Sequence, residues 1–343
     1  MERLLTESLR LFHDRETQMK RVQAGVCELL CLALLGCSRQ PAESRFFSYL
    51  ADPSARHSLV AFSPTNGDPR PGKDHRVPSR QSLADDLQAL RPGFDGLILY
   101  GYSNEDTPVI LEEAERLGYR AVLLGIWDPK SSDEITGTAQ LVRQHHPHLA
   151  LAVCVGNEGI AFDRYTLADV REGINSLRAL LPGILVPLCT SEPIAQYVDA
   201  NLRDTGDFLC PNIHFIFEHR EKSPAEGAHW VRGLAMSLAG SAHKAVLVKE
   251  TGMPHGGDDN FSPAAQRAFW ASYVTAGRLA RSQDSYRVWI SYAAAFEAFD
   301  LHWKAEESKM AIEERWGLLA ADRKPFPAFF VWQEAQNSPL ETK

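Results

Sequence analysis

The sequence contains no run of lysine or arginine longer than two residues, and its formal net charge at pH 7 is −8. Proteins that bind a nucleic acid backbone do so through clustered positive charge, which this chain does not supply. Nucleic acid is therefore not an expected partner. His145, His146 and His148 cluster at the end of a predicted helix, where a cationic last turn explains them. We expect neither a metal site nor a cofactor.

Cysteine is scarce: the 343 residues contain six, without a C-x-x-C pair. This pattern does not indicate a disulfide-stabilised scaffold. Cys154, Cys189 and Cys210 fall inside predicted buried strands, where a free cysteine acts as a small apolar side chain. Cys27 and Cys31 fall in an N-terminal segment of different character.

Residues 1–36 form that segment. Two basic residues, Lys20 and Arg21, precede a short apolar stretch from Leu29 to Leu35. Basic and short apolar segments in this order are typical of a secretory signal peptide. The stretch ends in Leu-Leu-Gly-Cys, and the cysteine in this position resembles the lipobox of bacterial lipoproteins. We expect Cys37 to be acylated and to anchor the protein to a membrane of the bacterial cell envelope, in the periplasm or at the outer membrane.

Two features of the segment fit this interpretation less well. Glu28 stands at the start of the apolar stretch, and the residues before Met19 make a long, charged leader. Translation from Met19 would account for the second feature. A helical or poorly ordered cytosolic extension is the alternative.

The remaining chain has the composition of a soluble globular protein, with 44% hydrophobic and 23% charged residues. Strand-like and helix-like segments alternate along it, which predicts an α/β fold with a parallel sheet. Its length suits a single (β/α)₈ barrel, or TIM barrel, which takes about 250 residues. We expect the barrel over residues 57–335, a linker over 37–56 and a tail over 336–343, and we expect a monomer.

The predicted strands are short and apolar, with boundaries that carry an error of about two to four residues. They are Ser58 to Phe62, Leu97 to Tyr100, Arg120 to Leu124, Leu149 to Val153, Ile184 to Leu188, Phe208 to Asn212, Ala245 to Lys249 and Val288 to Tyr292.

The predicted helices have apolar residues at helical spacing. They include Ser82 to Leu90, Thr107 to Leu117, Glu134 to His145, Leu167 to Leu181 and Pro263 to Arg281. A loop rich in glycine, proline and charge, from Pro64 to Pro78, follows the first strand. This loop is expected either to form part of a cleft wall or to be a mobile surface loop.

Two glutamates end apolar runs that read as buried strands. Glu158 follows Val-Cys-Val-Gly-Asn, and Glu250 follows Val-Leu-Val-Lys. One such glutamate alone is usually a solvated loop residue. In a parallel barrel, however, the carboxyl ends of the strands converge on one site. A pair of carboxylates at such a site is what a glycoside hydrolase uses for catalysis.

Further motifs accompany the pair and carry a resemblance to a known family. They are Gly-Asn-Glu at 156 to 158, Glu-Thr-Gly-x-Pro at 250 to 254, Phe-Glu-Ala-Phe-Asp at 296 to 300, Trp-Lys at 303 to 304 and Glu-x-x-Trp-Gly-Leu at 313 to 318. In this order they resemble glycoside hydrolase family 17, the β-1,3-glucanases and β-1,3-glucan transglycosylases. The Phe-Glu-Ala-Phe-Asp form is similar to bacterial and fungal members, and we expect a bacterial-type enzyme.

The resemblance implies a retaining double-displacement mechanism on β-1,3-glucan, with no cofactor. Glu158 would be the general acid and then the base, and Glu250 the nucleophile. Residues expected to contact the sugar are Asn157, Tyr100, Asn212, His214, Glu297, Lys304, Glu313 and Trp303. For Trp303 and Trp316, packing in the core is the favoured alternative.

Three positions depart from the pattern of the family. Met253 stands where tryptophan is usual, Leu301 where glutamate is usual, and Ile98 where arginine is usual. These replacements leave substrate range and activity open. A non-catalytic carbohydrate-binding barrel is therefore the alternative function.

A third possibility is an unrelated barrel enzyme, such as an aldolase, that uses a lysine within a strand. Lys249 is the candidate. Because side chains alternate along a strand, Lys249 is expected to point away from the face that carries Glu250.

The leader segment generates the first testable prediction. Acylated Cys37 should be the mature N-terminus, and the multiply acylated protein should partition with membranes or detergent because several acyl chains anchor firmly. Mass spectrometry of the protein from cells checks this. Recovery of an intact peptide that spans Gly36 and Cys37 would contradict it.

Overall fold

The computed structural model describes residues 44–52, 57–70, 72 and 75–337. The predicted leader and Cys37 lie outside the described residues. The described strands are β1 Leu59–Ala61, β2 Gly96–Ile98, β3 Ala121–Ile126, β4 Ala150–Asn157, β5 Leu188–Ser191, β6 Val246–Leu247, β7 Leu279–Arg281, β8 Trp289–Ser291 and β9 Ala294–Ala295. Together with the helices between them, they confirm an α/β fold.

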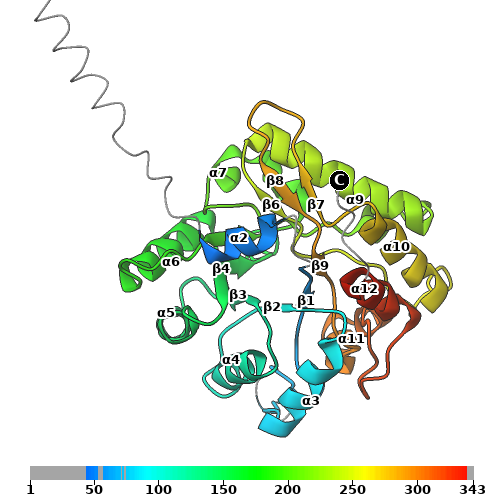
Figure 1. Ribbon diagram of the computed structural model, residues 1–343, viewed down its shortest axis with the longest axis horizontal. Coiled ribbons are helices and arrows are strands. Elements are labelled where there is room, and N and C mark those ends of the chain that lie inside the picture. Colours follow the sequence, from blue (N-terminus) through cyan, green and yellow to red (C-terminus); the bar gives the residue numbers. More distant parts are fainter. Residues whose placement is uncertain (1–43, 53–56, 71, 73–74, 338–343) are drawn as a thin grey trace, which may run out of the picture. The chain divides into compact units, whose positions relative to one another are not determined.

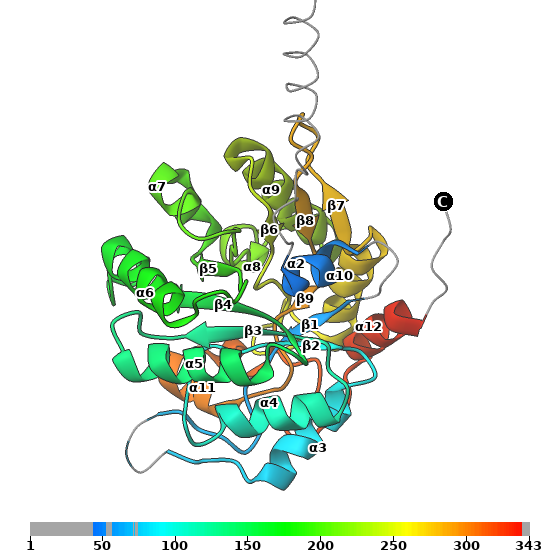
Figure 2. The same ribbon diagram turned by 60° about the vertical axis from the view of Figure 1, so that its left-hand side comes forward.

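Helices connect and surround these strands. They are α2 Arg45–Ala51, α3 Arg80–Leu90, α4 Thr107–Arg116, α5 Ser132–His145, α6 Leu167–Leu180, α7 Ala200–Arg203, α8 Phe215–Glu218, α9 Pro224–Ala242, α10 Pro263–Thr275, α11 His302–Ser308 and α12 Pro327–Asn337, with short 3₁₀ helices η2 Ile194–Val198 and η3 Ala311–Glu314. Helices α3 to α6 follow one another along the outside of the sheet (Figure 1; Figure 2). Among the described residues, no helix has both the length and the apolar character to span a membrane.

The sheet is curled and mostly parallel. Six strands pair in the order β5-β4-β3-β2-β1-β9, and β6, β8 and β7 form a second sheet. The predicted sixth strand, Phe208 to Asn212, forms isolated parallel bridges and no ladder: Leu209 pairs with Val246, and Asn212 pairs with Pro193 and Glu250. This segment thereby connects β5 to β6.

Two predicted boundaries are wrong. The helix expected over Pro263 to Arg281 ends at Thr275, because Gly277 adopts a φ of 87°, a value that favours glycine and ends helices. The following residues form β7, which runs antiparallel to β8. The fifth strand lies at Leu188–Ser191, later than expected. Ile184, where it was expected to begin, closes a turn instead: its backbone amide donates to the Leu181 carbonyl.

Side chains alternate between two cores along the parallel strands. One core, called the interior cluster here, includes Ala150, Ala152 and Cys154 of β4. Leu151 and Val153 of the same strand belong to the other core, which faces the helices. Leu59, Ile98, Ala121 and Leu123 also belong to the interior cluster. In β4 the interior side chains are small and the larger residues face the helices, and both faces are buried, as expected in a parallel sheet.

Helix α2 covers the N-terminal ends of these strands, in the segment that was expected to be a linker (Figure 1). Ser44 caps it by accepting a hydrogen bond from the Phe47 amide at 3.1 Å. Phe46 and Leu50 are fully buried in the interior cluster. The Phe47 ring packs edge-on against Trp289, with 5.4 Å between ring centroids. The helix therefore seals the interior at the end opposite the two glutamates.

This seal generates a stability prediction. Phe46→Ala should lower the free energy of unfolding by about 3–5 kcal/mol, because a large buried ring is lost and a cavity remains. Phe330→Ala is the control, since Phe330 is 45% exposed on α12. Denaturant unfolding measures both. Equal effects of the two substitutions would show that α2 does not contribute to the core.

Candidate active site

The two glutamates lie after the carboxyl ends of two strands, β4 and β6. Glu158 directly follows β4, and Glu250 pairs with Asn212 three residues after β6. Both line a cavity of about 700 Å³, which Asn157 and Tyr100 also line. The pair expected from the sequence is therefore brought together at one cavity.

The turn that carries Glu158 is shaped around one tyrosine. Gly156 has a φ of 84° and Glu158 a φ of 56°, both in the left-handed region, which is uncommon for a residue with a side chain. A Cβ atom on Gly159 would lie 2.0 Å from the Tyr165 ring, and the Gly159 amide donates to the Tyr165 hydroxyl at 3.0 Å. The two glycines thus leave room for Tyr165, which holds the turn. A backbone conformation of this kind is often found at functional sites.

Asn212 ends the segment from Phe208 to Asn212, called the bridging segment from here on, and connects Glu158 to its neighbours. The Asn212 side-chain amide donates to Glu158 Oε1 at 2.9 Å and to Asn157 Oδ1 at 3.3 Å. Its oxygen accepts from the Ser191 hydroxyl at 2.8 Å. Asn212 is 2% exposed, so the orientation of its amide is set by these three partners. Asn157 and Asn212, both expected at the site, therefore contact the glutamates or each other.

Glu250 makes its closest contacts with a lysine and a histidine. Lys249 Nζ donates to Glu250 Oε1 at 2.8 Å and to Asn157 Oδ1 at 2.8 Å. His214 Nε2 lies 3.6 Å from Glu250 Oε2. The expectation that Lys249 points away from Glu250 is wrong. Strand β6 ends at Leu247, so the regular alternation of side chains stops before Lys249, and its long chain reaches the carboxylate.

The environments of the two glutamates shift their pKa values in opposite directions. Burial and the negative charge of Glu250 raise the pKa of Glu158, against the opposing hydrogen bond from Asn212. Burial also raises the pKa of Glu250, but Lys249 and His214 outweigh it and hold that pKa well below its usual range. One carboxyl is therefore biased toward the protonated form and the other toward the ionised form, which is the division of roles that acid and nucleophile need.

A second charged group lies beside the pair. Glu297 is 1% exposed, and burial raises its pKa to about 7 despite its ion pair with Lys304. Lys304 Nζ also lies 4.8 Å from the centroid of the Phe296 ring. Burial raises the pKa of Glu313. Among these residues, Lys304 and Phe296 line the cavity.

Aromatic residues divide between the cavity and the core. Trp303 is partly exposed and lines the cavity, whereas Trp316 is 1% exposed and packs against the His214 ring at 5.0 Å. Trp316 is thus a core residue, whereas Trp303 lines the cavity and also packs against the core. Burial and the charge of Glu250 raise the pKa of Tyr100 well above its usual value, so its hydroxyl stays protonated.

The three unusual residues are apolar and buried. Met253 and Leu301 are 4% and 2% exposed in the core that faces the helices, and Ile98 is fully buried in the interior cluster. None of the three is among the residues that line the cavity. Their effect is therefore on packing around the site.

The loop after the first strand forms one wall of the cavity. Among its described residues, Pro64, Asp68, Arg70 and Arg76 line the cavity. Arg70 pairs with Glu306 of α11 at 2.8 Å, and His75 lies 2.9 Å from Glu105. These contacts connect the loop to other parts of the cavity wall, so its expected role as a cleft wall is confirmed for the described residues.

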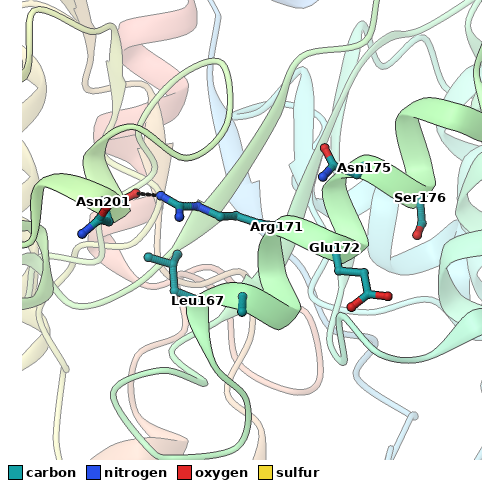
Figure 3. A pocket seen from close by; sticks show the side chains of 7 residues that line it. Leu167, Arg171, Glu172, Asn175, Ser176 and Asn201 are labelled. Carbon is teal, nitrogen blue, oxygen red and sulfur yellow. Dashed lines mark hydrogen bonds between the residues drawn. The ribbon is translucent and has the colours of Figure 1, made fainter.

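A second hollow, of about 610 Å³, lies on the outer helices α6 and α7 (Figure 3). It is lined by Leu167, Ala168, Arg171, Glu172, Asn175, Ser176 and Asn201. Arg171 donates to the Asn201 carbonyl at 2.8 Å. This hollow contains neither of the paired glutamates. Within the described ranges, no group of three or more His, Cys, Asp or Glu side chains is arranged to hold a metal ion.

A family model matches most of the chain. The BtgE/BtgC glycoside hydrolase domain matches residues 60–317, a span that contains every described residue expected at the site. The chain belongs to this family. The expectation of a glycoside hydrolase family is thereby confirmed.

A curated relative agrees with this assignment. The glucan endo-1,3-beta-glucosidase btgC of Emericella nidulans is 25% identical over 286 residues, which cover 76% of this chain and 44% of the relative. The chain therefore spans less than half the length of that relative.

Solved structures support the fold. The glycoside hydrolase family 17 β-1,3-glucanosyltransferase of Rhizomucor miehei has a TM-score of 0.61 at 15% identity, covering 80% of this chain and 97% of that one. An active-site mutant of the same enzyme in complex with laminaritriose also has a TM-score of 0.61, at 16% identity, covering 79% and 96%. The fold is thus similar to that of these two structures. The relative and the structures named here are fungal, so a bacterial type is not confirmed.

The opposite pKa shifts predict opposite effects on stability. A carboxyl whose pKa is raised on folding destabilises the protein above its unfolded pKa, whereas one whose pKa is lowered stabilises it there. Glu158→Gln should therefore raise the melting temperature at pH 7, and this gain should vanish as the pH falls below the unfolded pKa of a glutamate, about 4.3. Glu250→Gln should lower stability at pH 7, by as much as about 3–5 kcal/mol, because Lys249 loses its counter-charge.

Thermal unfolding between pH 3 and pH 7 measures both effects, and each variant controls for the other. Changes of the same sign at pH 7 would contradict the assigned environments.

Proposed function

We propose that this protein is a retaining glycoside hydrolase or transglycosylase that acts on β-1,3-glucan, with Glu250 as nucleophile and Glu158 as general acid and base. The observation that carries the proposal is that both glutamates line one cavity with pKa values shifted in opposite directions. Family membership supports the reaction class. The names of the relative and of the structural neighbours support the β-1,3 linkage.

In the first step, ionised Glu250 attacks the anomeric carbon while Glu158 gives its proton to the departing glycosidic oxygen. Oε1 of Glu250 is held by Lys249, which leaves Oε2, on the side of His214, as the attacking atom. The products of this step are a glycosyl ester of Glu250 and a free sugar hydroxyl.

In the second step, Glu158 has become a carboxylate and takes a proton from the incoming water or sugar hydroxyl. Attack on the ester carbon releases Glu250 with retained configuration. A carboxyl separation of about 5–5.5 Å is the spacing for this mechanism.

Around the pair, we assign the sugar contacts to Asn157, Tyr100, Lys304 and Trp303, which line the cavity. Asn157 suits a hydrogen bond to the sugar 2-hydroxyl, a contact that strengthens in the transition state. Four further residues expected at the site act through their neighbours. Asn212 and His214 hold Glu158 and Glu250, and Glu297 and Glu313 set the charge around Lys304.

Two finer features belong to the same proposal. We propose that the chain forms a closed (β/α)₈ barrel. The isolated bridges of Leu209 and Asn212, which connect the two sheets, support this proposal. We also propose that a lipid at Cys37 anchors the enzyme in a bacterial envelope.

The central experiment is product analysis on a linear β-1,3-glucan. Glu158→Gln should lower turnover by roughly 10²–10⁴-fold, the usual contribution of a general acid or base. Glu250→Gln should lower it at least as much, because the covalent intermediate then cannot form. The control is Glu172→Gln, at an exposed residue of the α6 hollow (Figure 3), which should keep full activity. Wild-type binding of glucan without any cleavage would replace this proposal with the carbohydrate-binding alternative.

The same reaction distinguishes transfer from hydrolysis. At high concentration of a β-1,3-linked oligosaccharide, products longer than the starting sugar should appear at early times, because a glycosyl ester of Glu250 is open to attack by sugar hydroxyls as well as water. Only shorter sugars would identify a plain hydrolase.

A further inference from the structure

Lys249 is a buried cation in direct contact with the proposed nucleophile. It is 1% exposed, and its ammonium donates to Glu250 Oε1 and to Asn157 Oδ1, each at 2.8 Å. The ammonium also lies 4.5 Å from the centroid of the Tyr100 ring. The mechanism above assigns this residue no part in the transfer of a proton or a bond.

A buried ammonium costs several kcal/mol of lost hydration unless a partner compensates it. Burial lowers the pKa of Lys249, but the charge of Glu250 outweighs that effect, so its pKa is raised and the ammonium stays charged. The site therefore holds a positive charge while Glu250 is ionised.

The other groups that face this ion pair come from several elements. Each of these groups interacts electrostatically with Glu250 or Lys249. They are His214 after the bridging segment, Glu158 after β4, Tyr100 after β2, Glu297 after β9, Glu313 on η3, and the thiols of Cys154, Cys189 and Cys210 in the interior. Burial raises the pKa of each thiol, so the thiols are neutral at the pH values of interest. Lys249 is the cation in hydrogen-bond contact with Glu250.

Hydrogen bonds also connect Lys249 to the proposed acid. Lys249 and Asn212 both donate to Asn157 Oδ1, and Asn212 donates to Glu158 Oε1 at 2.9 Å. Lys249 thus contacts Glu250 directly and is connected to Glu158 through the side chains of Asn157 and Asn212.

We propose that Lys249 is a positioning residue that serves as the fixed counter-charge of the site in both steps, for Glu250 before the glycosyl ester forms and for Glu158 afterwards. This inference rests on the proposed function.

The balance of charge explains the role. Before the first step, the site holds ionised Glu250, protonated Glu158 and the Lys249 ammonium. When the Glu250–sugar bond forms and the glycosidic bond breaks, the proton of Glu158 leaves with the departing oxygen. Glu250 is then a neutral ester and Glu158 carries the negative charge. In the ester, Glu250 no longer compensates the ammonium, and ionised Glu158 takes its place as the counter-charge. The ammonium of Lys249 in turn favours the ionised form of Glu158 that the second step needs.

The test compares Lys249→Met and Lys249→Gln with the wild type. Gln keeps a hydrogen-bond donor and removes the charge. The control is Lys244→Met, because Lys244 is a partly buried lysine that donates to the carbonyls of Arg203 and Gly206, away from the cavity. Two measurements are made: kcat/KM against pH on a β-1,3-linked oligosaccharide, and reactivation against pH of enzyme trapped by an activated 2-fluoro-β-glucoside, whose ester on Glu250 is confirmed by mass spectrometry.

Both Lys249 variants should move the acidic limb of the kcat/KM profile upward by roughly 1–3 pH units, the usual effect of an adjacent opposite charge. Reactivation of the trapped enzyme should slow by about tenfold or more at pH 5, the loss expected for an upward shift of one pKa unit in Glu158, and should recover as the pH rises. Lys244→Met should leave both profiles unchanged.

A loss of activity that is the same at every pH, or profiles that match the wild type, would overturn the role of Lys249. Failure of Lys249→Gln to fold would also overturn it, since that result would make the residue structural. An inactive wild type on every β-1,3-glucan would instead refute the proposed function, so the two failures are distinguishable.

Discussion

The organisation of the site depends on the ion pair between Lys249 and Glu250. Both side chains are almost fully buried, and neither charge is tolerable there without the other. The pair sets the ionised state of Glu250, and the negative charge of Glu250 in turn raises the pKa of Glu158. The contact with Lys249 at 2.8 Å, together with His214, therefore separates the properties of two chemically identical carboxyls.

The local backbone conformation places the Glu158 carboxyl where the charges of Glu250 and Lys249 act on it. Gly156 and Gly159 leave room for the Tyr165 ring, and Glu192 accepts the amides of Ile160 and Ala161 at 3.0 and 3.1 Å. The turn is thus held from two sides, and Glu158 keeps its left-handed conformation. Asn212 then fixes the carboxyl itself. Rigid support of this kind is what a catalytic group needs to stay within reach of its partner.

Much of this arrangement was predictable from local sequence signals. Continuous apolar runs identified β3 and β4, and the glutamate after such a run lies where a parallel sheet presents its functional residues. Lys249 was not predictable in this way, because its contact with Glu250 depends on where β6 ends. Helix α2 was missed because a short aromatic segment such as Arg45–Ala51 becomes a helix through its contacts with distant rings. The segment from Phe208 to Asn212 has strand composition but pairs only through isolated bridges.

The seal at the N-terminal ends of the strands has a consequence for the order in which the protein can fold. Phe47 of α2 packs against Phe208 and Trp289, so the beginning, the middle and the end of the chain must all be present before the interior closes. Contacts between residues so far apart in the chain carry a large loop-closure entropy and slow the folding of a domain. During synthesis on the ribosome, α2 emerges well before its partner Trp289. Phe47 therefore lacks its partner Trp289 until most of the chain is made, and transiently exposed aromatic surface of this kind promotes aggregation.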